Sequence, residues 1–395
     1  MLSLNPIISI LIATKNRIPY CINTIETILQ LPNKNFNLIV QDNSDSKELF
    51  DYVSNFISDS RLIYNYTPPP FSSIDNFNAA LELASGEYVC LIGDDDGICS
   101  QIFEVVEWAS KNKIESICPK IFCEYIWPDS LGTNDDAKLA IPDTEGTIKS
   151  VDTSKLLTRF FEQGALDYLS MGFPKLYHGI VKMECLERIK DKTGNYLGGL
   201  SPDIYAAITL ACTVKSHVVI DFPLTIAGSC KQSTTIASVK GKHSGNLKNA
   251  PHFRDRGIYI WDSLIPPIYS IETIWAETAL KALEDMKRTD LRILFNVDVF
   301  TIKNILRNTN KSTYFVFETI KHLKKNKTNV LRYLKLVFLF FNFIFEFIIK
   351  RFFKTRILKV SNSTFNKVPD IKSATDICTK TLINRKIYYP ISKNN

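Results

Sequence analysis

Short apolar runs alternate with amphipathic stretches along the first hundred residues of the chain. The apolar runs are rich in β-branched residues and predict buried strands; they cover residues 7–14, 36–44, 61–67 and 87–93. Each stretch between them carries apolar residues at helical spacing, as in "PYCINTIETILQL" (19–31). Strands separated by helices predict a parallel sheet that binds its ligands at the carboxyl ends of the strands.

The pattern loosens after residue 100. Residues 116–127 predict a strand, and residues 128–150, rich in Asp, Gly, Thr and Pro, predict a surface loop. A Ser-Pro-Asp start opens a predicted helix at 201–213. Residues 260–328 predict a mostly helical region, and no internal repeat is visible.

The segment 330–353, "VLRYLKLVFLFFNFIFEFIIKRFF", is apolar on nearly all sides and carries basic residues at both ends. Its uninterrupted apolar runs are too short for a transmembrane span, because Asn342 and Glu346 lie inside them. A helix lying in a membrane interface fits this composition. A core helix of the C-terminal region is the open alternative.

The composition is that of a globular protein, with 45% hydrophobic and 23% charged residues. The 9 cysteines form no C-x-x-C pair, which favours reduced thiols over disulfides or a zinc site. The start "MLSLNPIISILIATKNR" has no basic leader or cleavage site and predicts a strand, not a signal peptide. The net charge of +7 is uneven, because residues 301–395 hold 20 Lys+Arg against 4 Asp+Glu. Such a basic region predicts an anionic partner, lipid or nucleic acid.

Three adjacent aspartates follow the apolar run in "YVCLIGDDDGI" (88–98). Their carboxylates repel one another, so the folded chain needs a positive partner beside them. A divalent metal that carries a diphosphate would supply it, because Mg²⁺ commonly binds one or two carboxylates plus substrate phosphates. The alternative is a solvated turn, since "DDDG" is also good turn chemistry.

The segments around this run resemble the inverting family 2 glycosyltransferases, which have an A-type nucleotide-sugar-binding fold. "ATKNR" (13–17) resembles their first nucleotide-contacting loop, and "LIVQDNSDS" (38–46) resembles their second strand. "NFNAALELASGEYVCLIGDDD" (76–96) resembles the helix and A-x-G step before their metal motif. The resemblance covers roughly residues 7–230. It implies an α/β fold with a mostly parallel, Rossmann-like sheet flanked by helices, and here a helical C-terminal extension follows.

The resemblance also implies a nucleotide-sugar site. Asp42 matches the aspartate that receives the base of the nucleotide. The other residues expected to bind the nucleotide sugar are Thr14, Asn16, Arg17, Asn78 and Asp94.

The metal motif departs from the family in one place. Gly93 stands where the first aspartate of the usual Asp-x-Asp motif belongs, so Asp95 takes the second, metal-binding position. Asp95 is therefore expected to bind Mn²⁺ or Mg²⁺, with Asp96 as a further candidate for metal or sugar. Asp94 is expected to bind ribose or to be solvated.

An inverting transfer needs a general base that takes the proton from the attacking acceptor hydroxyl. The family places an aspartate at a helix start beyond a variable acceptor region, and "GNYLGGLSPDIYAAI" offers Asp203 in that context. The alternative role for Asp203 is stabilisation of the first helical turn beside Pro202.

The histidines and nearby lysines leave more alternatives open. Related folds place a late histidine on the metal or the diphosphate, which makes His243 a candidate metal ligand and a surface-loop residue the alternative. His178 is either a residue of the acceptor pocket or an ordinary strand residue. Lys240 and Lys242 either neutralise the leaving diphosphate or are solvated.

These observations predict four regions. Residues 1–235 form the catalytic domain and 236–329 a helical region; 330–359 form a basic, aromatic, membrane-associating helix and 360–395 a basic tail. The expected partners are a nucleoside-diphosphate sugar (UDP-sugar first), a saccharide or lipid-linked saccharide acceptor, and an anionic membrane, but not nucleic acid, because no nucleic-acid-binding motif appears. The expected role is surface polysaccharide synthesis in a bacterium, at the cytoplasmic face of the cell membrane.

Two other functions are compatible with parts of the pattern. A sugar nucleotidyltransferase should have a Gly-rich loop after the first strand, but "ATKNRIPY" contains no glycine. A non-catalytic membrane-associated binding protein would explain the basic C-terminal region, but not the aspartate run.

Overall fold

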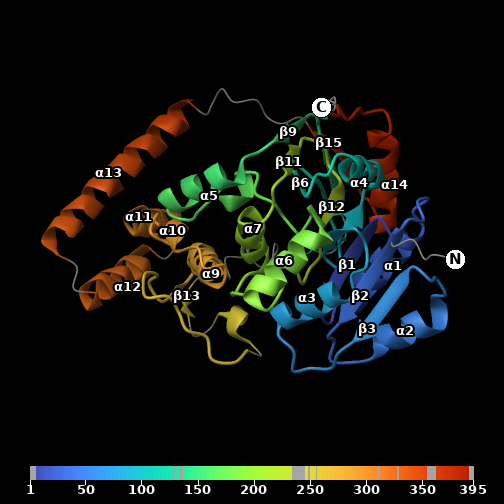
Figure 1. The fold of residues 1–395 in the computed structure, drawn as a ribbon, viewed down its shortest axis with the longest axis horizontal. Coiled ribbons are helices and arrows are strands. Elements are labelled where there is room, and N and C mark those ends of the chain that lie inside the picture. Colours follow the sequence, from blue (N-terminus) through green and yellow to red (C-terminus); the bar gives the residue numbers. More distant parts are fainter. Residues whose placement is uncertain are drawn as a thin grey trace.

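A computed structural model describes residues 6–128, 130, 132, 137–233, 245–247, 250–254, 256–308, 312–326, 329–353 and 362–390. Its centre is an eight-stranded sheet in the order β3-β2-β1-β4-β10-β6-β11-β9 (Figure 1). These strands are β1 (Ile8–Thr14), β2 (Phe36–Asp42), β3 (Leu62–Tyr66), β4 (Tyr88–Ile92), β6 (Ser116–Pro119), β9 (Ile148–Ser150), β10 (Ile180–Lys182) and β11 (His217–Ile220). The first four strands pair in parallel, as predicted. The other half is mixed, because β10 runs antiparallel to both of its neighbours and β9 runs antiparallel to β11.

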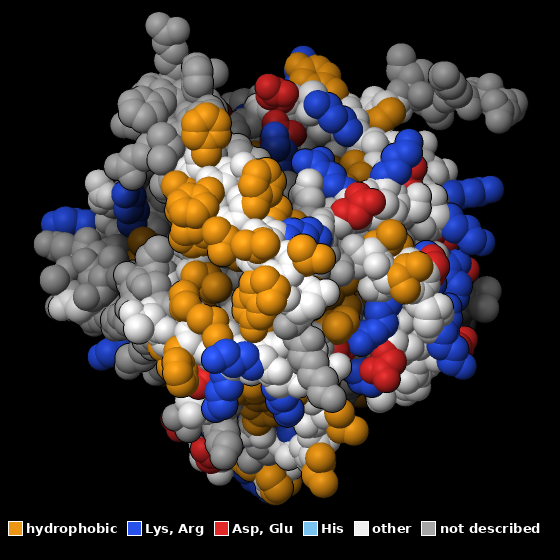
Figure 2. Space-filling model, turned by 90° about the vertical axis from the view of Figure 1, so that its left-hand side faces the viewer, with side chains coloured by type: hydrophobic (Ala, Val, Ile, Leu, Met, Phe, Trp, Pro, Cys, Tyr) orange, Lys and Arg blue, Asp and Glu red, His pale blue; other side chains and the backbone are white. Residues whose placement is uncertain are grey.

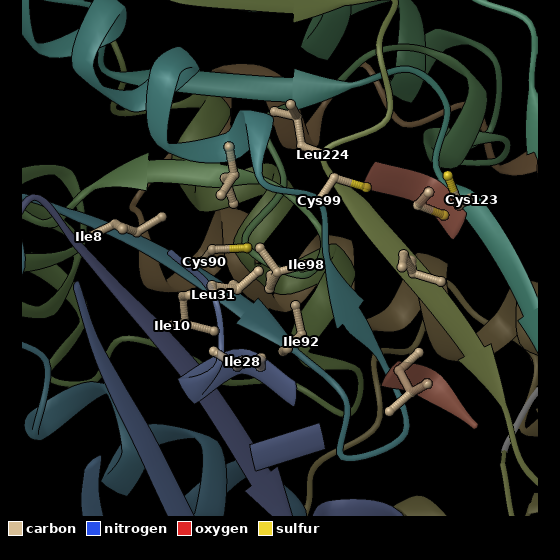
Figure 3. Close-up of a cluster of buried hydrophobic side chains, with 14 of the residues drawn as sticks. Ile8, Ile10, Ile28, Leu31, Cys90, Ile92, Ile98, Cys99, Cys123 and Leu224 are labelled. Atoms are coloured by element: carbon tan, nitrogen blue, oxygen red, sulfur yellow. The ribbon is translucent and has the colours of Figure 1, made fainter. Parts of the chain in front are cut away.

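Helices cover both faces of the parallel half. They are α1 (Ile18–Leu29), α2 (Glu48–Phe56), α3 (Ser73–Glu82) and α4 (Gln101–Lys111). Alternate residues of β1 enter opposite cores: Ile10 faces one core and Leu11 the other. Figure 3 shows part of the first core, where Ile10 of β1, Ile28 of α1 and Ile92 of β4 converge. A strand buried on both faces explains why these runs are continuously apolar.

A five-stranded second sheet contains segments that the sequence did not predict as strands. Its order is β15-β8-β7-β12-β5, and its strands are β5 (Gly97–Ile98), β7 (Cys123–Ile126), β8 (Lys138–Pro142), β12 (Thr225–Ser229) and β15 (Asn362–Asn366). The predicted surface loop at 128–150 was wrong in part, because it contains β8 and β9. In β8 the alternating residues Leu139 and Ile141 are fully buried, a signal that is too short to stand out in a polar segment.

The segment expected to be a basic tail also differs from that prediction. The described part of 360–395 folds onto the body of the protein: β15 pairs with β8 along five residues, and α14 (Ile371–Leu382) buries Ile371, Ala374 and Cys378 in the first core. Its charge is carried on the exposed side of an amphipathic helix, which is why composition alone did not reveal the packing.

Helices make up most of the rest of the chain. They are α5 (Thr153–Glu162), α6 (Met183–Thr193), α7 (Pro202–Ala211), α9 (Ile271–Asp285), α10 (Thr289–Arg292), α11 (Val297–Arg307), α12 (Ser312–Lys325) and α13 (Val330–Phe353). A short pair of strands, β13 (Gly245–Asn246) and β14 (Ile268–Tyr269), precedes α9. In Figure 1, α11, α12 and α13 lie at the opposite end of the molecule from α1 and α2. The predicted fold class is therefore confirmed, whereas the domain boundaries at 235, 329 and 359 stay predictions.

Candidate active site

The aspartate run lies directly after β4, at the sheet edge where β1 and β2 also end. Asp94, Asp95 and Asp96 are almost fully buried, with 3%, 3% and 1% of their surfaces exposed. A turn does form at this point, but it is not solvated. Burial therefore raises the pKa of all three carboxyl groups, and the interactions around them must hold their charge.

The positive partner of the run in the described part of the chain is Arg17. Its Nη1 donates to Asp94 Oδ1 at 2.9 Å and lies 3.6 Å from Asp95 Oδ1. Its Nη2 donates to the carbonyl of Gln232. Burial works against the charge of Arg17, but Asp94 and Asp95 raise its pKa above the ordinary value. Thr14 completes the arrangement by donating from Oγ1 to Asp94 Oδ2 at 2.6 Å.

Asp96 holds the turn in place. Its Oδ2 accepts from the backbone of Gly93 at 2.6 Å and from the hydroxyl of Tyr177 at 2.9 Å, and its Oδ1 accepts from the backbone of Gly228 at 2.6 Å. His178 Nε2 lies 3.3 Å from Oδ2, and burial, then Lys175, lower the pKa of this imidazole to about 3, so it is neutral. Because both oxygens of Asp96 already accept hydrogen bonds, this residue fits an anchoring role better than the predicted metal contact.

Asp95 carries the carboxylate oxygen of the run with the fewest hydrogen bonds from described residues. Its Oδ2 accepts from the backbone of Cys230 at 3.0 Å, whereas Oδ1 meets only Arg17, at 3.6 Å, among the described residues. A carboxylate oxygen is the hard ligand that Mg²⁺ and Mn²⁺ prefer. Within the described ranges no group of three or more His, Cys, Asp or Glu side chains is placed to hold a metal.

The glycine that replaces the first aspartate of the motif has a steric reason. A Cβ at Gly93 would lie 2.7 Å from Tyr177 Oη and 2.9 Å from Asp96 Oδ2. Side-chain atoms do not approach that closely, so the hydrogen bond between Tyr177 and Asp96 requires glycine at this position. The departure from Asp-x-Asp is thus built into the packing of the turn.

Restoring the aspartate should therefore damage the protein. Gly93→Asp is expected to lower the melting temperature and to reduce transfer at least tenfold, because overpacking a buried site costs about 1–3 kcal/mol and a fourth carboxylate would face the run. Thermal unfolding and initial rates measure both effects. Gly93→Ala in a Tyr177→Phe background is the matched relief variant, since the nearest clashing atom is then gone. A Gly93→Asp protein as stable and as active as the wild type would contradict this explanation.

The predicted nucleotide-binding residues fall into two groups. Asp42 is fully buried at the end of β2, where it accepts from Tyr64 Oη at 2.6 Å and from the backbone of Ser44 at 2.8 Å. Asn16, at a φ of 59°, joins this edge by hydrogen bonds to Asp45 in both directions. Together with Thr14, Arg17 and Asp94, these residues do gather at one edge of the sheet.

Asn78 does not join them. Its side chain accepts from the backbone N–H of Leu197 and donates to the carbonyl of the same residue, at 2.9 and 3.0 Å. It therefore ties α3 to the chain that leads into α7. Asn76, which the sequence analysis did not select, reaches the edge instead: its Nδ2 donates to the carbonyl of Thr14, and its buried Oδ1 has no partner among the described residues.

Asp203 lies in the first turn of α7 and does not act as a cap. The N-cap of this helix is Ser201, and no side chain caps its first turn. No hydrogen bond or ion pair reaches the Asp203 carboxylate from any part of the chain that the structure describes. Burial raises the pKa of Asp203 to about 6, opposed only by Lys175. The alternative role, stabilisation of the first helical turn, would therefore act through the helix dipole and not through a capping hydrogen bond.

Tyr177 connects the two acidic positions. Its hydroxyl is bonded to Asp96, and its pKa is raised well above the usual value by burial and then by Asp96, Asp95 and Asp203. Tyr177 is therefore close enough to feel the charge of Asp203 as well as that of the aspartate run. The chain just before α7 is fixed by Thr278 of α9, whose Oγ1 accepts from the backbone of Leu200 and of Ser201.

Three further predictions need a separate outcome. His178 is not a strand residue, since it lies in a turn just before β10 with a φ of 56°, and its role in an acceptor pocket stays a prediction. Its Nδ1 lies 2.9 Å from Thr225 Oγ1, and its ring stacks on Phe122. His243, Lys240 and Lys242 lie outside the described residues. Tyr177 belongs to no recognisable sequence motif, so the sequence alone did not identify it as a site residue.

Comparisons with known proteins give a family for the segment that holds the aspartate run. Residues 9–142, which include β1 to β4 and the aspartate run, match the family model described as "Glycosyl transferase family 2". This segment is similar to the family 2 glycosyltransferases. The family resemblance and the fold class that the sequence implied are therefore confirmed, and the matched residues include Thr14, Asp42 and Asp95.

More distant similarities extend beyond the domain. A segment of 94 residues is 33% identical to the WcaA protein of Escherichia coli (strain K12), whose name proposes for it the role of a colanic acid biosynthesis glycosyl transferase. The match covers 23% of this chain and 33% of that relative, so it spans about a third of the relative's length. Among solved structures, S. aureus TarS (residues 1–349, in complex with UDP-GlcNAc) has a TM-score of 0.41 at 14% identity, covering 82% of this chain and 93% of that one. This last likeness is too distant to carry an argument about function.

Proposed function

We propose that this protein is an inverting glycosyltransferase that moves a sugar from a nucleoside-diphosphate sugar to a hydroxyl acceptor. The observation that carries the proposal is the carboxylate of Asp203, which has no hydrogen-bond or ion-pair partner in the described chain and which, like the aspartate turn, raises the pKa of Tyr177. A carboxylate without such a partner is suited to accept a proton. The name of the WcaA relative supports a role in the synthesis of a surface polysaccharide.

The sheet edge is the proposed donor site. Asp42 and Asn16 lie where the nucleotide would bind, and a UDP-sugar is the first candidate. Arg17 and Thr14 hold Asp94, so this carboxylate is available to the ribose only if it exchanges those partners. Arg17 is itself suited to a diphosphate, because a guanidinium binds phosphate oxygens in pairs.

Asp95 is the proposed metal-binding residue. A bound Mn²⁺ or Mg²⁺ would stabilise the negative charge that develops on the leaving diphosphate. Asp96 would keep the turn in register from behind, through its bonds to Gly93 and Gly228. His243 stays a candidate ligand outside the described residues.

Asp203 is the proposed general base. It takes the proton of the acceptor hydroxyl while the oxygen attacks the sugar from the face opposite the diphosphate, and a single displacement of this kind inverts the configuration. With a pKa of about 6 the carboxylate is ionised near neutral pH. This pKa is also close enough to neutral pH for efficient proton transfer. The acceptor is a saccharide or a lipid-linked saccharide at the cytoplasmic face of the membrane.

The two alternatives fit the site less well. A nucleotidyltransferase needs a Gly-rich phosphate loop, whereas the turn between β1 and α1 consists of Lys15, Asn16 and Arg17. A non-catalytic binding protein would not account for an acid such as Asp203, whose raised pKa suits proton transfer.

A donor screen tests the proposed function. Nucleoside diphosphates and their sugars, with and without Mn²⁺, are compared by thermal shift, and the donors that bind are followed by slow hydrolysis and by transfer to candidate acceptors. We expect one nucleotide to stabilise the protein more strongly with the metal present. NMR of the transferred sugar should show the inverted anomer. Retention of configuration, or release of pyrophosphate from a nucleoside triphosphate, would contradict the proposal.

A further inference from the structure

The outer side of α13 carries a stripe of exposed apolar side chains. Its members lie one, three or four residues apart, as on one side of a helix, and each is more than half exposed: Leu331, Leu334, Val337, Phe338, Phe341 and Phe345. A helix on the surface of a soluble protein normally presents charged and polar residues on this side. Large contiguous apolar patches mark interaction surfaces, so this stripe requires a partner.

The opposite side of α13 is already occupied by the protein. Leu336 is buried against Ile302 of α11 and Leu323 of α12. Arg332 and Lys335 both pair with Asp298 of α11, at 2.7 and 2.8 Å. These contacts fix the rotation of the helix and leave the stripe outward. The alternative of a core helix therefore explains one side of α13 and not the other.

We propose that this stripe docks on the surface of an anionic lipid bilayer, with α13 lying along the membrane. Figure 2 shows apolar side chains gathered on the face of the molecule that carries α12 and α13, with Lys and Arg side chains beside them. Insertion of Phe and Leu side chains into the headgroup boundary, aided by nearby basic residues, is how an interfacial helix binds. Among the helices that the structure describes, none is long and apolar enough to cross the bilayer instead.

Charge favours a lipid surface over a second copy of the chain. Residues 311–359 contain 12 Lys+Arg and 2 Asp+Glu. In a symmetric dimer through this stripe the same basic segment would face itself, and like charges would oppose the contact. An anionic membrane has the charge that complements such a basic segment.

Vesicle binding tests the surface. The full chain is sedimented with vesicles of phosphatidylcholine alone or mixed with phosphatidylglycerol, at low and raised salt. The double variant Phe338→Asp/Phe341→Asp is compared with Phe56→Asp/Ile293→Asp, which places the same charges at apolar positions that are 74% and 82% exposed elsewhere. We expect the first variant to bind at least about tenfold more weakly, since each lost phenylalanine removes a large apolar contribution. The control should bind like the wild type, and raised salt should weaken vesicle binding of the wild type and of the control.

Further measurements keep the outcomes distinct. The melting temperature and the stabilisation by nucleotide show whether the variant is folded, and sedimentation velocity reports self-association. Equal vesicle binding by both double variants, or none by the wild type, would overturn the inference. So would a wild-type dimer that dissociates only in Phe338→Asp/Phe341→Asp, since a second copy would then cover the stripe. The inference rests on the proposed function only for its purpose, the capture of a lipid-linked acceptor, and vesicle binding needs neither donor nor acceptor.

Discussion

Asp203→Asn is expected to reduce turnover by about 10²–10⁴-fold, the usual contribution of a general base. The amide keeps the shape of the side chain and cannot accept the proton of the acceptor hydroxyl. Donor affinity should change little, because the proton moves only in the chemical step. Steady-state transfer rates and nucleotide binding, measured on the same preparation, separate the two effects.

The same residue predicts a pH dependence. Since the pKa of Asp203 is about 6, the wild-type rate should fall as the pH drops through 6 and the base becomes protonated. This limb should be absent from the residual activity of Asp203→Asn.

Stability provides the control for Asp203. In the unfolded chain an aspartate has a pKa of about 3.9, so folding raises the value for this residue. A raised carboxyl pKa contributes stability below pH 4, and that contribution is lost as the pH rises through 6. Asp203→Asn should therefore melt at a higher temperature than the wild type near neutral pH. A lower melting temperature with turnover per folded molecule retained would identify a structural acid instead.

The parallel half of the fold was predictable because its signals are local. Each of β1 to β4 is an unbroken apolar run, and each intervening helix repeats its apolar residues within two or three turns. The antiparallel β10 has three residues, and β15 reaches β8 from more than two hundred residues away. A strand of three residues is too short to show a periodic pattern. A pairing between segments far apart in the chain gives no local signal in a single sequence.

The part of the site that depends on local sequence signals was also predictable. Asp42, Asp94 and Asp95 follow strands, so the parallel sheet brings them together. Choosing between Asn76 and Asn78 required the rotation of α3, because residues two apart on a helix point to nearly opposite sides. The anchoring of Asp96 depends on Tyr177 and Gly228, which are distant in sequence and belong to no motif.

Removing the charge of Asp95 is expected to abolish measurable transfer. Lewis-acid assistance is worth several kcal/mol, and each 1.36 kcal/mol is about a tenfold change in rate. Asp95→Asn is the informative variant, because its amide oxygen can still accept from the backbone of Cys230 and so keeps the turn closed. The affinity for Mn²⁺ in the presence of nucleotide should fall together with the rate. The EPR signal of the free ion measures this affinity.

Asp94→Asn is the matched comparison, since the two residues are neighbours, are equally buried and both contact Arg17. Asp94→Asn should lower the rate less than Asp95→Asn does. Its metal binding should also be closer to that of the wild type, because Asp94 is held by Thr14 and Arg17. If Asp94→Asn lost the metal and Asp95→Asn kept it, the motif would be shifted by one residue. If neither lost it, the metal would be held by residues outside the aspartate turn, and Arg17 would be the main counter-charge of the run in the active enzyme.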